Sequence, residues 1–425
     1  MRVAYLYYLE TYRSDAFTEA LAGAESVTSL HVFDFTFLRK VFRGGDIDAR
    51  AQRERHLKRL AGQSAAVAYH VCPAVRLGAS GWRWQVSLVL SVLLALAWGA
   101  LIPLRMWRAG IERAVFYNGH PLYLLSFLYA RLRRLPVHTD LGDVLYLVDN
   151  PNPWSKRLEL AFLRASETIV CVSRPFKEHL CQTYSFAEQR VRILSAALPE
   201  AFPRAFDEGR NAERRFALRQ LIGAAPSDLV IVYAGYRWFR HVDGKGVIDV
   251  QGLDGLCQAV ERLNDRGVPS QLVIVGAPVA DPTLADFTQG RYGARFHVLG
   301  RYRPLDERHT MALGGGDVLC IPSAGSRIYQ LYDRFKMYEY LAAGKRVVCA
   351  DVPINHDVFG DGAEYFRDDD VADLARGIEA ARSRAVLFDA SLNARVAERY
   401  LWHNRLAEGA ISTALFDPAT VVERH

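Results

Sequence analysis

The sequence DRFKMYEYLAAGKRVVCADVP, residues 333–353, predicts a short helix followed at once by a buried strand. Asp333 can cap the start of the helix, and Gly344 stands where a helix end favours a left-handed residue. The uncharged run 347–350 is typical of a strand covered on both faces. Three apolar residues recur at helical spacing and predict one inward-facing stripe: Phe335, Tyr338 and Ala342. This helix-then-strand unit favours an α/β fold with a parallel sheet.

Two chargeable residues lie within this predicted helix. Lys336 and Glu339 are three residues apart, so they share one face of its first turns. A helix N-terminus favours anionic oxygens, and a lysine there reinforces that preference. A carboxylate can accept hydrogen bonds from sugar hydroxyls. The pair therefore suits a phosphorylated ligand that carries hydroxyls; the alternative is an exposed ion pair of a few tenths of a kcal/mol, as many helices carry.

Three upstream blocks, together with this stretch, resemble the nucleotide-sugar signature of retaining GT-B glycosyltransferases, in particular glycosyltransferase family 4. Residues 232–263 read as a strand, a glycine, a loop with Lys-Gly and a helix. Residues 272–279, LVIVGAPV, read as a strand ending in glycine. Residues 298–323 read as a strand, Gly-Arg, a helix, an aspartate and a strand closed by Pro-Ser. The resemblance implies transfer of a sugar from a nucleotide-diphosphate donor to an acceptor hydroxyl, with retention and without a metal or further cofactor.

The resemblance also implies roles for residues at the matching positions. Lys336 and Lys245 would face the diphosphate and stabilise the leaving group as its charge develops. Glu339 matches the family glutamate that hydrogen-bonds the nucleoside ribose. The remaining donor-site candidates are Arg237, Gly235, Arg301 and Ser323. For Lys245 the alternative is an ordinary solvated loop lysine.

One position departs from the family pattern. Many members carry two glutamates in the spacing E-x7-E, but the residue eight positions before Glu339 is Leu331. The missing glutamate helps to hold the donor sugar in the family, so the identity of the sugar stays open. Asp333 is near enough to substitute, although helix capping explains it equally well.

Acceptor-side candidates follow strand-like runs in the N-terminal half. Asp143, just after the strand predicted at 137–141, and less strongly Asp140, near the end of that strand, could orient or deprotonate an acceptor hydroxyl, because the carboxyl ends of parallel strands face the ligand crevice. The alternative for Asp143 is a turn cap beside Gly142. His120 is a weaker candidate after another strand. The glycine-rich loop common after the family's first strand is missing here.

Strand-like runs alternate with helical stretches throughout, which predicts two Rossmann-like, doubly wound domains facing a cleft, as in GT-B folds. We expect an N-terminal acceptor-side domain at 1–200, a nucleotide-sugar domain at 201–390, and a C-terminal helix within 391–425 that crosses back to the first domain. The predicted strands are 3–9, 27–33, 65–72, 114–117, 137–141, 168–172, 191–194, 229–234, 271–275, 296–299, 318–321 and 346–350.

Residues 84–104, WQVSLVLSVLLALAWGALIPL, contain no charge and are long enough to span a bilayer. A span would separate strand 3–9 from strand 114–117, which we expect in one sheet. We therefore favour a helix lying in the membrane interface, with a buried helix and a spanning helix as alternatives. Flanking arginines favour an anionic membrane surface. This suggests a peripheral protein on the cytoplasmic face of the cell membrane, with a lipid-linked saccharide as acceptor in polysaccharide assembly.

Composition excludes several other classes of protein. The net charge of +6 over 425 residues is a mild excess and does not indicate a nucleic-acid binder. Six scattered cysteines without a C-x-x-C pair are typical of reduced cytosolic thiols. There is no phosphate loop, nucleophile elbow or histidine cluster with metal spacing. The alternatives to a transferase are a catalytically silent GT-B scaffold that binds a partner or membrane, and a GT-B epimerase or phosphorylase.

Overall fold

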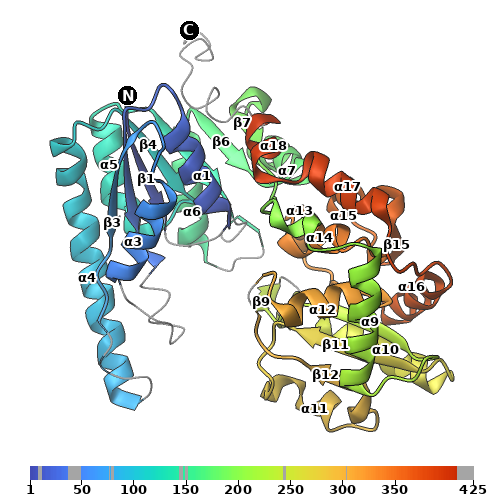
Figure 1. Cartoon of the computed structure of the whole chain (residues 1–425). Helices are drawn as coiled ribbons and strands as arrows, with labels where there is room; N and C mark the ends of the chain where they lie inside the picture. Colours follow the sequence, from blue (N-terminus) through green and yellow to red (C-terminus); the bar gives the residue numbers. More distant parts are fainter. Residues whose placement is uncertain are drawn as a thin grey trace. The chain divides into compact units, whose positions relative to one another are not determined.

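The computed structural model describes residues 1–7, 12–36, 49–75, 77, 81–142, 147–148, 152–242, 246–302 and 304–408. The chain forms two compact units (Figure 1). The N-terminal unit comprises residues 1–172, 176–195 and the chain end from 406. The C-terminal unit comprises residues 173–175 and 196–405.

The N-terminal unit is built on a seven-stranded parallel sheet with the order β3-β2-β1-β4-β5-β6-β7. Its strands are β1 Arg2–Tyr7, β2 Ser29–Asp34, β3 Ala66–Val71, β4 Arg113–Tyr117, β5 Val137–Leu141, β6 Thr168–Cys171 and β7 Val191–Ile193. Its helices are α1 Tyr12–Gly23, α3 Ala49–Arg59, α4 Gly81–Arg108, α5 Leu124–Leu132, α6 Pro153–Ala165 and α7 Arg174–Tyr184, whose first residues belong to the other unit. The central strand β1 pairs with β2 and β4, placing Val3 opposite Leu30 and Arg113.

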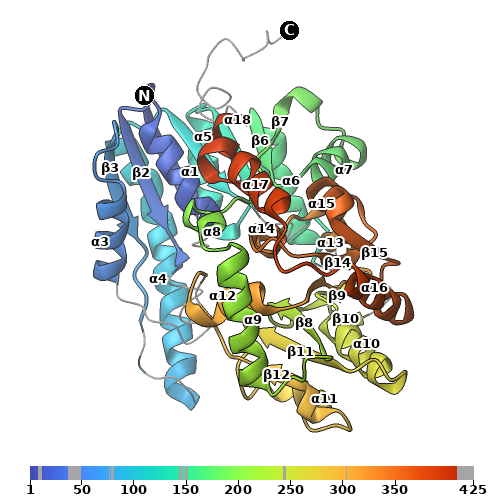
Figure 2. The ribbon, with the colours of Figure 1, turned by 45° about the vertical axis from the view of Figure 1, so that its right-hand side comes forward.

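The C-terminal unit holds a six-stranded parallel sheet, β12-β11-β8-β13-β14-β15, and a hairpin, β9-β10. The strands are β8 Leu229–Ala234, β9 Phe239–Val242, β10 Gly246–Asp249, β11 Ser270–Val275, β12 Phe296–Val298, β13 Val318–Ile321, β14 Val347–Ala350 and β15 Ala363–Phe366. The helices are α8 Ala201–Arg204, α9 Glu208–Ile222, α10 Leu253–Asp265, α11 Ala285–Thr288, α12 Glu307–Gly315, α13 Arg327–Leu331, α14 Phe335–Ala342, α15 Pro353–Phe359, α16 Val371–Ser383, α17 Ala390–Arg399 and α18 Trp402–Glu408. Helix α9 packs along α12, and α10 along α16 (Figure 2).

The two parallel sheets with their helices confirm the predicted fold class. Every predicted strand is present, with ends shifted by no more than two residues. The sequence analysis missed β15 and the hairpin β9-β10. The predicted domain limits, and the return of the last helix to the first domain, stay predictions.

The stretch 333–353 forms the expected helix and strand, α14 and β14, with one correction at the start of the helix. Gly344 is left-handed with φ +63°, as predicted. Asp333 is not the cap, because α14 begins after Arg334 and the Asp333 carboxylate instead accepts from the Ala196 N–H at 2.5 Å and the Tyr338 hydroxyl at 2.9 Å. The helix is buried from Met337 to Ala342 on every side, and not along one stripe alone.

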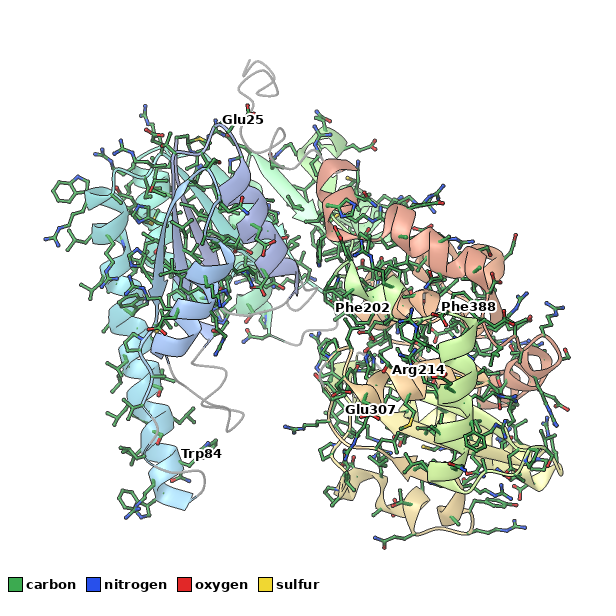
Figure 3. The ribbon with its side chains drawn as sticks, viewed as in Figure 1. Glu25, Trp84, Phe202, Arg214, Glu307 and Phe388 are labelled. Carbon is green, nitrogen blue, oxygen red and sulfur yellow. The ribbon has the colours of Figure 1, made fainter. Side chains whose placement is uncertain are left out.

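Helix α4 contains the apolar run predicted at 84–104 and connects β3 to β4 within one sheet. Ala95, Ile102 and Met106 pack into the core beneath the sheet, which α5 and α6 share. Trp84 lies on the part of α4 that runs past the strands (Figure 3). There Ser87 and Ser91 accept hydrogen bonds from the backbone at residues 77 and 75. By length and composition α4 passes as a membrane span. Only 28% of its apolar window is buried against the described residues, whereas a core helix would be mostly buried.

Candidate functional site

Strand β8 of the C-terminal unit ends at Ala234, and the glycine that follows it, Gly235, leaves room for a side chain from another element. Gly235 has φ +155°, and a Cβ there would lie 2.7 Å from Nζ of Lys336 and 2.8 Å from the Tyr233 hydroxyl oxygen. Such distances are closer than van der Waals contact. The glycine therefore allows the lysine of α14 to reach the carboxyl end of a central strand, which is where open α/β sheets bind their ligands.

The Lys336 ammonium is oriented by two groups. Its Nζ donates to Oε1 of Gln251 at 2.8 Å and lies 4.2 Å from the centre of the Tyr233 ring. The Tyr233 hydroxyl donates to the same amide oxygen at 2.5 Å. Burial, and secondly the Arg334 guanidinium, lower the pKa of Lys336 to about 7, although the nearby Glu339 charge opposes that shift. Lys336 therefore changes its charge near neutral pH, and a phosphate beside it would favour the charged form.

Glu339 lies one turn further along α14 and is 3% exposed. Its Oε2 lies 3.6 Å from Nε2 of His309 on α12. Together with Lys336 it forms the part of the predicted donor site that the structure brings together. Arg334, at the start of α14, donates to Oδ1 of Asn355 at 3.1 Å and its guanidinium lies 4.4 Å from the Tyr329 ring centre. Two cationic side chains thus converge on the first turn of α14.

The other predicted donor-site residues lie in different surroundings. The Arg237 guanidinium is paired with Asp254 of α10 and donates to the Thr283 carbonyl, so its charge is already neutralised. Arg301 is exposed and follows Gly300, whose φ is +91°. Lys245 and the acceptor-side candidate Asp143 lie outside the described residues. The roles of all four stay predictions.

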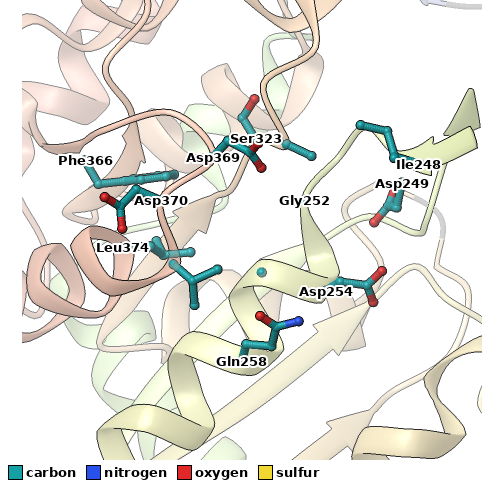
Figure 4. A pocket seen from close by; sticks show the side chains of 13 residues that line it. Ile248, Asp249, Gly252, Asp254, Gln258, Ser323, Phe366, Asp369, Asp370 and Leu374 are labelled. Atoms are coloured by element: carbon teal, nitrogen blue, oxygen red, sulfur yellow. The ribbon is translucent and has the colours of Figure 1, made fainter. Parts of the chain in front are cut away.

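Ser323 borders a pocket of about 300 Å³ (Figure 4). The pocket opens where α10 and α16 begin, beside the end of β13. Three of its carboxylates have partners within the protein: Asp249 accepts from backbone N–H groups at 238, 251 and 253, Asp254 pairs with Arg237, and Asp370 caps α16. Across the described residues no group of three His, Cys, Asp or Glu could hold a metal ion. Segment 249–252 lines this pocket and also carries Gln251, which contacts Lys336, so the pocket lies beside the lysine site.

Sequence reasoning missed Gln251, Tyr233 and His309. Gln251 is 85 residues from Lys336 in the chain, and no spacing pattern links the two. The only signal was the position of Tyr233 near the end of a predicted strand, which places a residue at the ligand edge of the sheet without saying what it contacts. His309 lies in a helix whose sequence resembled the family only in outline.

In the N-terminal unit, two weaker acceptor-side candidates lie at strand ends. Asp140 is buried near the end of β5, and its Oδ2 lies 3.5 Å from the Tyr5 hydroxyl of β1. The next turn requires Gly142, because a Cβ there would lie 2.3 Å from the Tyr117 ring. His120 accepts from the Leu122 N–H at 3.3 Å as a helix cap, and burial lowers its pKa to about 4. His120 is therefore neutral at physiological pH.

Residues 244–383 match the family model of glycosyl transferases group 1. The matched segment begins between β9 and β10, ends with α16 and includes Lys336 and Glu339. No curated protein matches the chain. The family match confirms the resemblance found in the sequence for this segment: residues 244–383 are similar to group 1 glycosyltransferases, and the two-sheet architecture is a GT-B fold.

Solved structures of the same fold extend this likeness over nearly the whole chain. A glycosyltransferase from Rickettsia africae ESF-5 has a TM-score of 0.61 at 13% identity and covers 98% of this chain and 99% of its own. Anabaena Alr3699/HepE in complex with UDP and glucose has a TM-score of 0.62 at 13% identity, covering 97% and 100%. WaaG, a glycosyltransferase involved in lipopolysaccharide biosynthesis, has a TM-score of 0.57 at 14% identity, covering 97% and 99%. At these identities the likeness concerns the fold alone.

Proposed function

We propose that this glycosyltransferase moves a hexosyl group from a nucleotide-diphosphate sugar to an acceptor hydroxyl, with retention and without a metal ion. The observation that carries the proposal is the Lys336 ammonium, which lies beside Gly235 at the end of β8 and in the first turn of α14. This position combines a fixed cation with a helix N-terminus, and both stabilise an anionic leaving group. Retention and metal independence rest on the family resemblance.

Lys336 and Glu339 take different parts of the donor in this proposal. Lys336 binds the diphosphate, and its partner Gln251 holds the ammonium at the strand end. Glu339, one turn away, accepts hydrogen bonds from the ribose hydroxyls. Fixing both ends of the nucleotide orients the sugar–phosphate bond for transfer, which is a large part of what such an enzyme contributes. Asp143, with Asp140 second, remains the candidate to orient or deprotonate the acceptor.

UDP-glucose is the first donor to test. Anabaena Alr3699/HepE crystallised with UDP-glucose, and another neighbour is described as a UDP-forming trehalose-phosphate synthase from Burkholderia vietnamiensis. The sugar is tested separately from the nucleotide, since Leu331 stands where the resemblance places the glutamate that helps to hold the sugar.

Calorimetry and turnover assays test the donor site directly. We expect wild-type protein to bind UDP, and Lys336→Ala and Glu339→Ala each to lower kcat/KM by at least about tenfold, or about 1.4 kcal/mol. Lys345→Met is the matched control, because Lys345 is also buried but lies beyond the C-terminal end of α14, nine residues from Lys336. Wild-type rates in both α14 variants would refute the assignment, and wild-type protein that binds neither UDP nor GDP would favour the scaffold alternative.

We further propose that α4 and α5 dock the enzyme on an anionic lipid bilayer. The two helices pack against each other, and both expose large apolar side chains. On α4 these are Trp82, Val89, Leu90, Leu93, Leu96, Leu101, Leu104 and Trp107, and on α5 they are Leu124, Leu125, Leu128 and Leu132. These twelve residues form the α4-α5 surface. Exposed apolar surface of this extent is typical of an interaction site.

Charge selects a membrane as the occupant. Exposed arginines border the α4-α5 surface at Arg83, Arg108, Arg131, Arg133 and Arg134, whereas residues 84–104 carry no charge. Apolar side chains entering the acyl region with arginines at the phosphate level are the pattern of an interfacial helix. The connection of α4 to β3 and β4 of one sheet favours a helix lying along the bilayer over one that crosses it. An acceptor attached to lipid, on the cytoplasmic face, follows naturally from this position.

Vesicle flotation tests the membrane proposal. We expect the full chain to float with vesicles containing phosphatidylglycerol, and Leu93→Glu and Leu128→Glu to abolish flotation. Leu221→Glu is the matched control, because Leu221 is equally exposed, at 59%, on α9 of the other unit. Equal flotation of all three variants would overturn the proposal, as would wild-type protein that stays in the soluble fraction.

A further inference from the structure

A fully buried histidine faces the Glu339 carboxylate. His309 is 0% exposed, and its Nε2 has no hydrogen-bond partner within the described residues. Oε2 of Glu339 lies 3.6 Å from this nitrogen, about 0.4 Å beyond the usual range of an N–H···O hydrogen bond. Leaving a buried N–H unpaired is unfavourable. A small rotation of either side chain would therefore close a hydrogen bond between the two.

The hydrogen bond at the other ring nitrogen fixes where the proton of His309 lies. The Leu305 N–H donates to Nδ1 at 3.3 Å, so Nδ1 is an acceptor. A neutral imidazole then carries its proton on Nε2, the nitrogen that faces Glu339. His309 is thus a donor aimed at the carboxylate, and not an acceptor that would repel it.

The packing around His309 holds its ring in that orientation. The Tyr302 ring stacks on the imidazole with centres 4.1 Å apart and planes 8° from parallel. The Phe202 ring meets it edge-on at 6.2 Å. Asp306 caps the start of α12 by accepting from the His309 N–H at 2.9 Å, which fixes the backbone as well. The imidazole cannot swing away without disturbing both aromatic contacts.

We propose that His309 is a positioning residue for the donor nucleotide. It holds Oε2 of Glu339, which turns Oε1 toward the ribose hydroxyls and keeps the carboxylate oriented. The inference rests on the proposed role of Glu339 in ribose binding. His309 itself touches no substrate.

Discrimination between a ribose and a sugar without hydroxyls tests this inference. Calorimetry on the full chain compares UDP with 2′,3′-dideoxy-UDP. We expect wild-type protein to prefer UDP by about tenfold or more, the usual effect of hydrogen bonds to a charged group. His309→Leu should lose most of that preference while binding the dideoxy ligand as before. His309→Gln should retain it, because a side-chain amide can still donate toward Glu339. His309→Met serves as a second variant should the leucine variant fail to fold.

A double variant separates positioning from general damage. Glu339→Gln should abolish the preference for ribose, and adding His309→Leu should cause no further loss, since the histidine acts through the glutamate. Equal weakening of both ligands in His309→Leu would indicate a merely structural role and overturn the inference. Undiminished preference in that variant would do the same. Failure of the proposed function has a different signature: wild-type protein would then bind neither ligand.

Discussion

Helices α14 and α4 were both predicted from apolar sequence, but one is buried in the structure and the other is largely exposed. Helix α14 is buried from Met337 to Ala342, and it nevertheless carries Lys336 and Glu339. Helix α4 is far longer and almost free of charge, yet it buries only a narrow stripe that includes Ala95 and Ile102.

The difference shows which residues of each helix need an explanation. Burying a chargeable group is unfavourable, so Lys336 and Glu339 indicate a ligand that interacts with charge. Exposing a continuous row of leucines is also unfavourable, so α4 indicates an apolar partner. In each helix the residues that disagree with their surroundings are the ones that point to function.

The largest expected effect tests the two faces of α4. Ile102→Asp should lower the free energy of unfolding by about 4 kcal/mol, because Ile102 is fully buried and the new carboxylate would have no partner. Leu101→Asp, one residue away but 48% exposed, should change it by less than about 0.5 kcal/mol. Urea unfolding in detergent-free buffer measures both. Equal losses would mean that α4 is enclosed in solution, and the proposed membrane contact would fail with it.

The next effect concerns the approach of α14 to β8. Gly235→Ala should lower kcat/KM by about tenfold, because the methyl group would displace the Lys336 ammonium, whose flexible side chain can move without unfolding the protein. Gly62→Ala is the control: its φ is +93° and nothing lies near the added methyl group, so it imposes backbone strain alone. Initial rates together with thermal unfolding distinguish a displaced lysine from a damaged fold. A variant that turns over at the wild-type rate would show that Lys336 does not depend on this glycine.

The parallel strands could be predicted because each one is recognised from its own residues. A strand covered on both faces is a short uncharged run, and 347–350 or 229–234 can be recognised without knowing the neighbours. The missed elements lack that signal. Strand β9, FRHV, mixes charge with apolar residues, and β15, AEYF, lies at the edge of the sheet with Glu364 on it. Edge strands and hairpins are half solvated, so their composition resembles that of loops.

Only the part of the candidate site that lies on α14 could be predicted from the sequence. Lys336 and Glu339 share a turn of α14, and local spacing predicted them together. Gln251 and His309 reach them from other segments, through the order of strands and the packing of α12, which no local pattern encodes. Arg237 illustrates the converse: its position near Gly235 suggested a free cation, but Asp254 on α10 neutralises it.

A smaller effect is expected from pH, and it sharpens the contrast between the two helices. Since the pKa of Lys336 is about 7, its ammonium loses its proton as the pH rises through neutrality. Affinity for UDP-glucose, whose diphosphate does not titrate in this range, should fall by about fivefold between pH 6.5 and 8.5. Calorimetry on wild type and Lys336→Met measures this, and the variant should show no slope. A slope of equal size in the variant would assign the titration to another group.

The same lowered pKa has an opposite consequence for the ligand-free fold. Between about pH 7 and 10.5 the unfolded chain holds the Lys336 proton more tightly than the folded chain does. The free energy of unfolding should therefore gain a contribution that rises with pH across this window, and Lys336→Met should remove it. Urea unfolding at several pH values provides the check without any ligand.

The smallest expected effect comes from single arginines at the border of the α4-α5 surface. Arg131→Gln should weaken partition onto anionic vesicles by about threefold to fivefold, because each basic residue near such a surface contributes roughly 1 kcal/mol. Arg192→Gln, an exposed arginine on β7, should have no effect if α5 and not net charge governs binding. Partition measured at two salt concentrations separates the terms, since salt screens the arginine contribution but leaves the apolar contacts of Leu128 and its neighbours. Equal losses in both variants would show that overall charge attracts the protein to the anionic vesicles. Helix α4 would then resemble α14 in having a charged partner and would differ from it in composition alone.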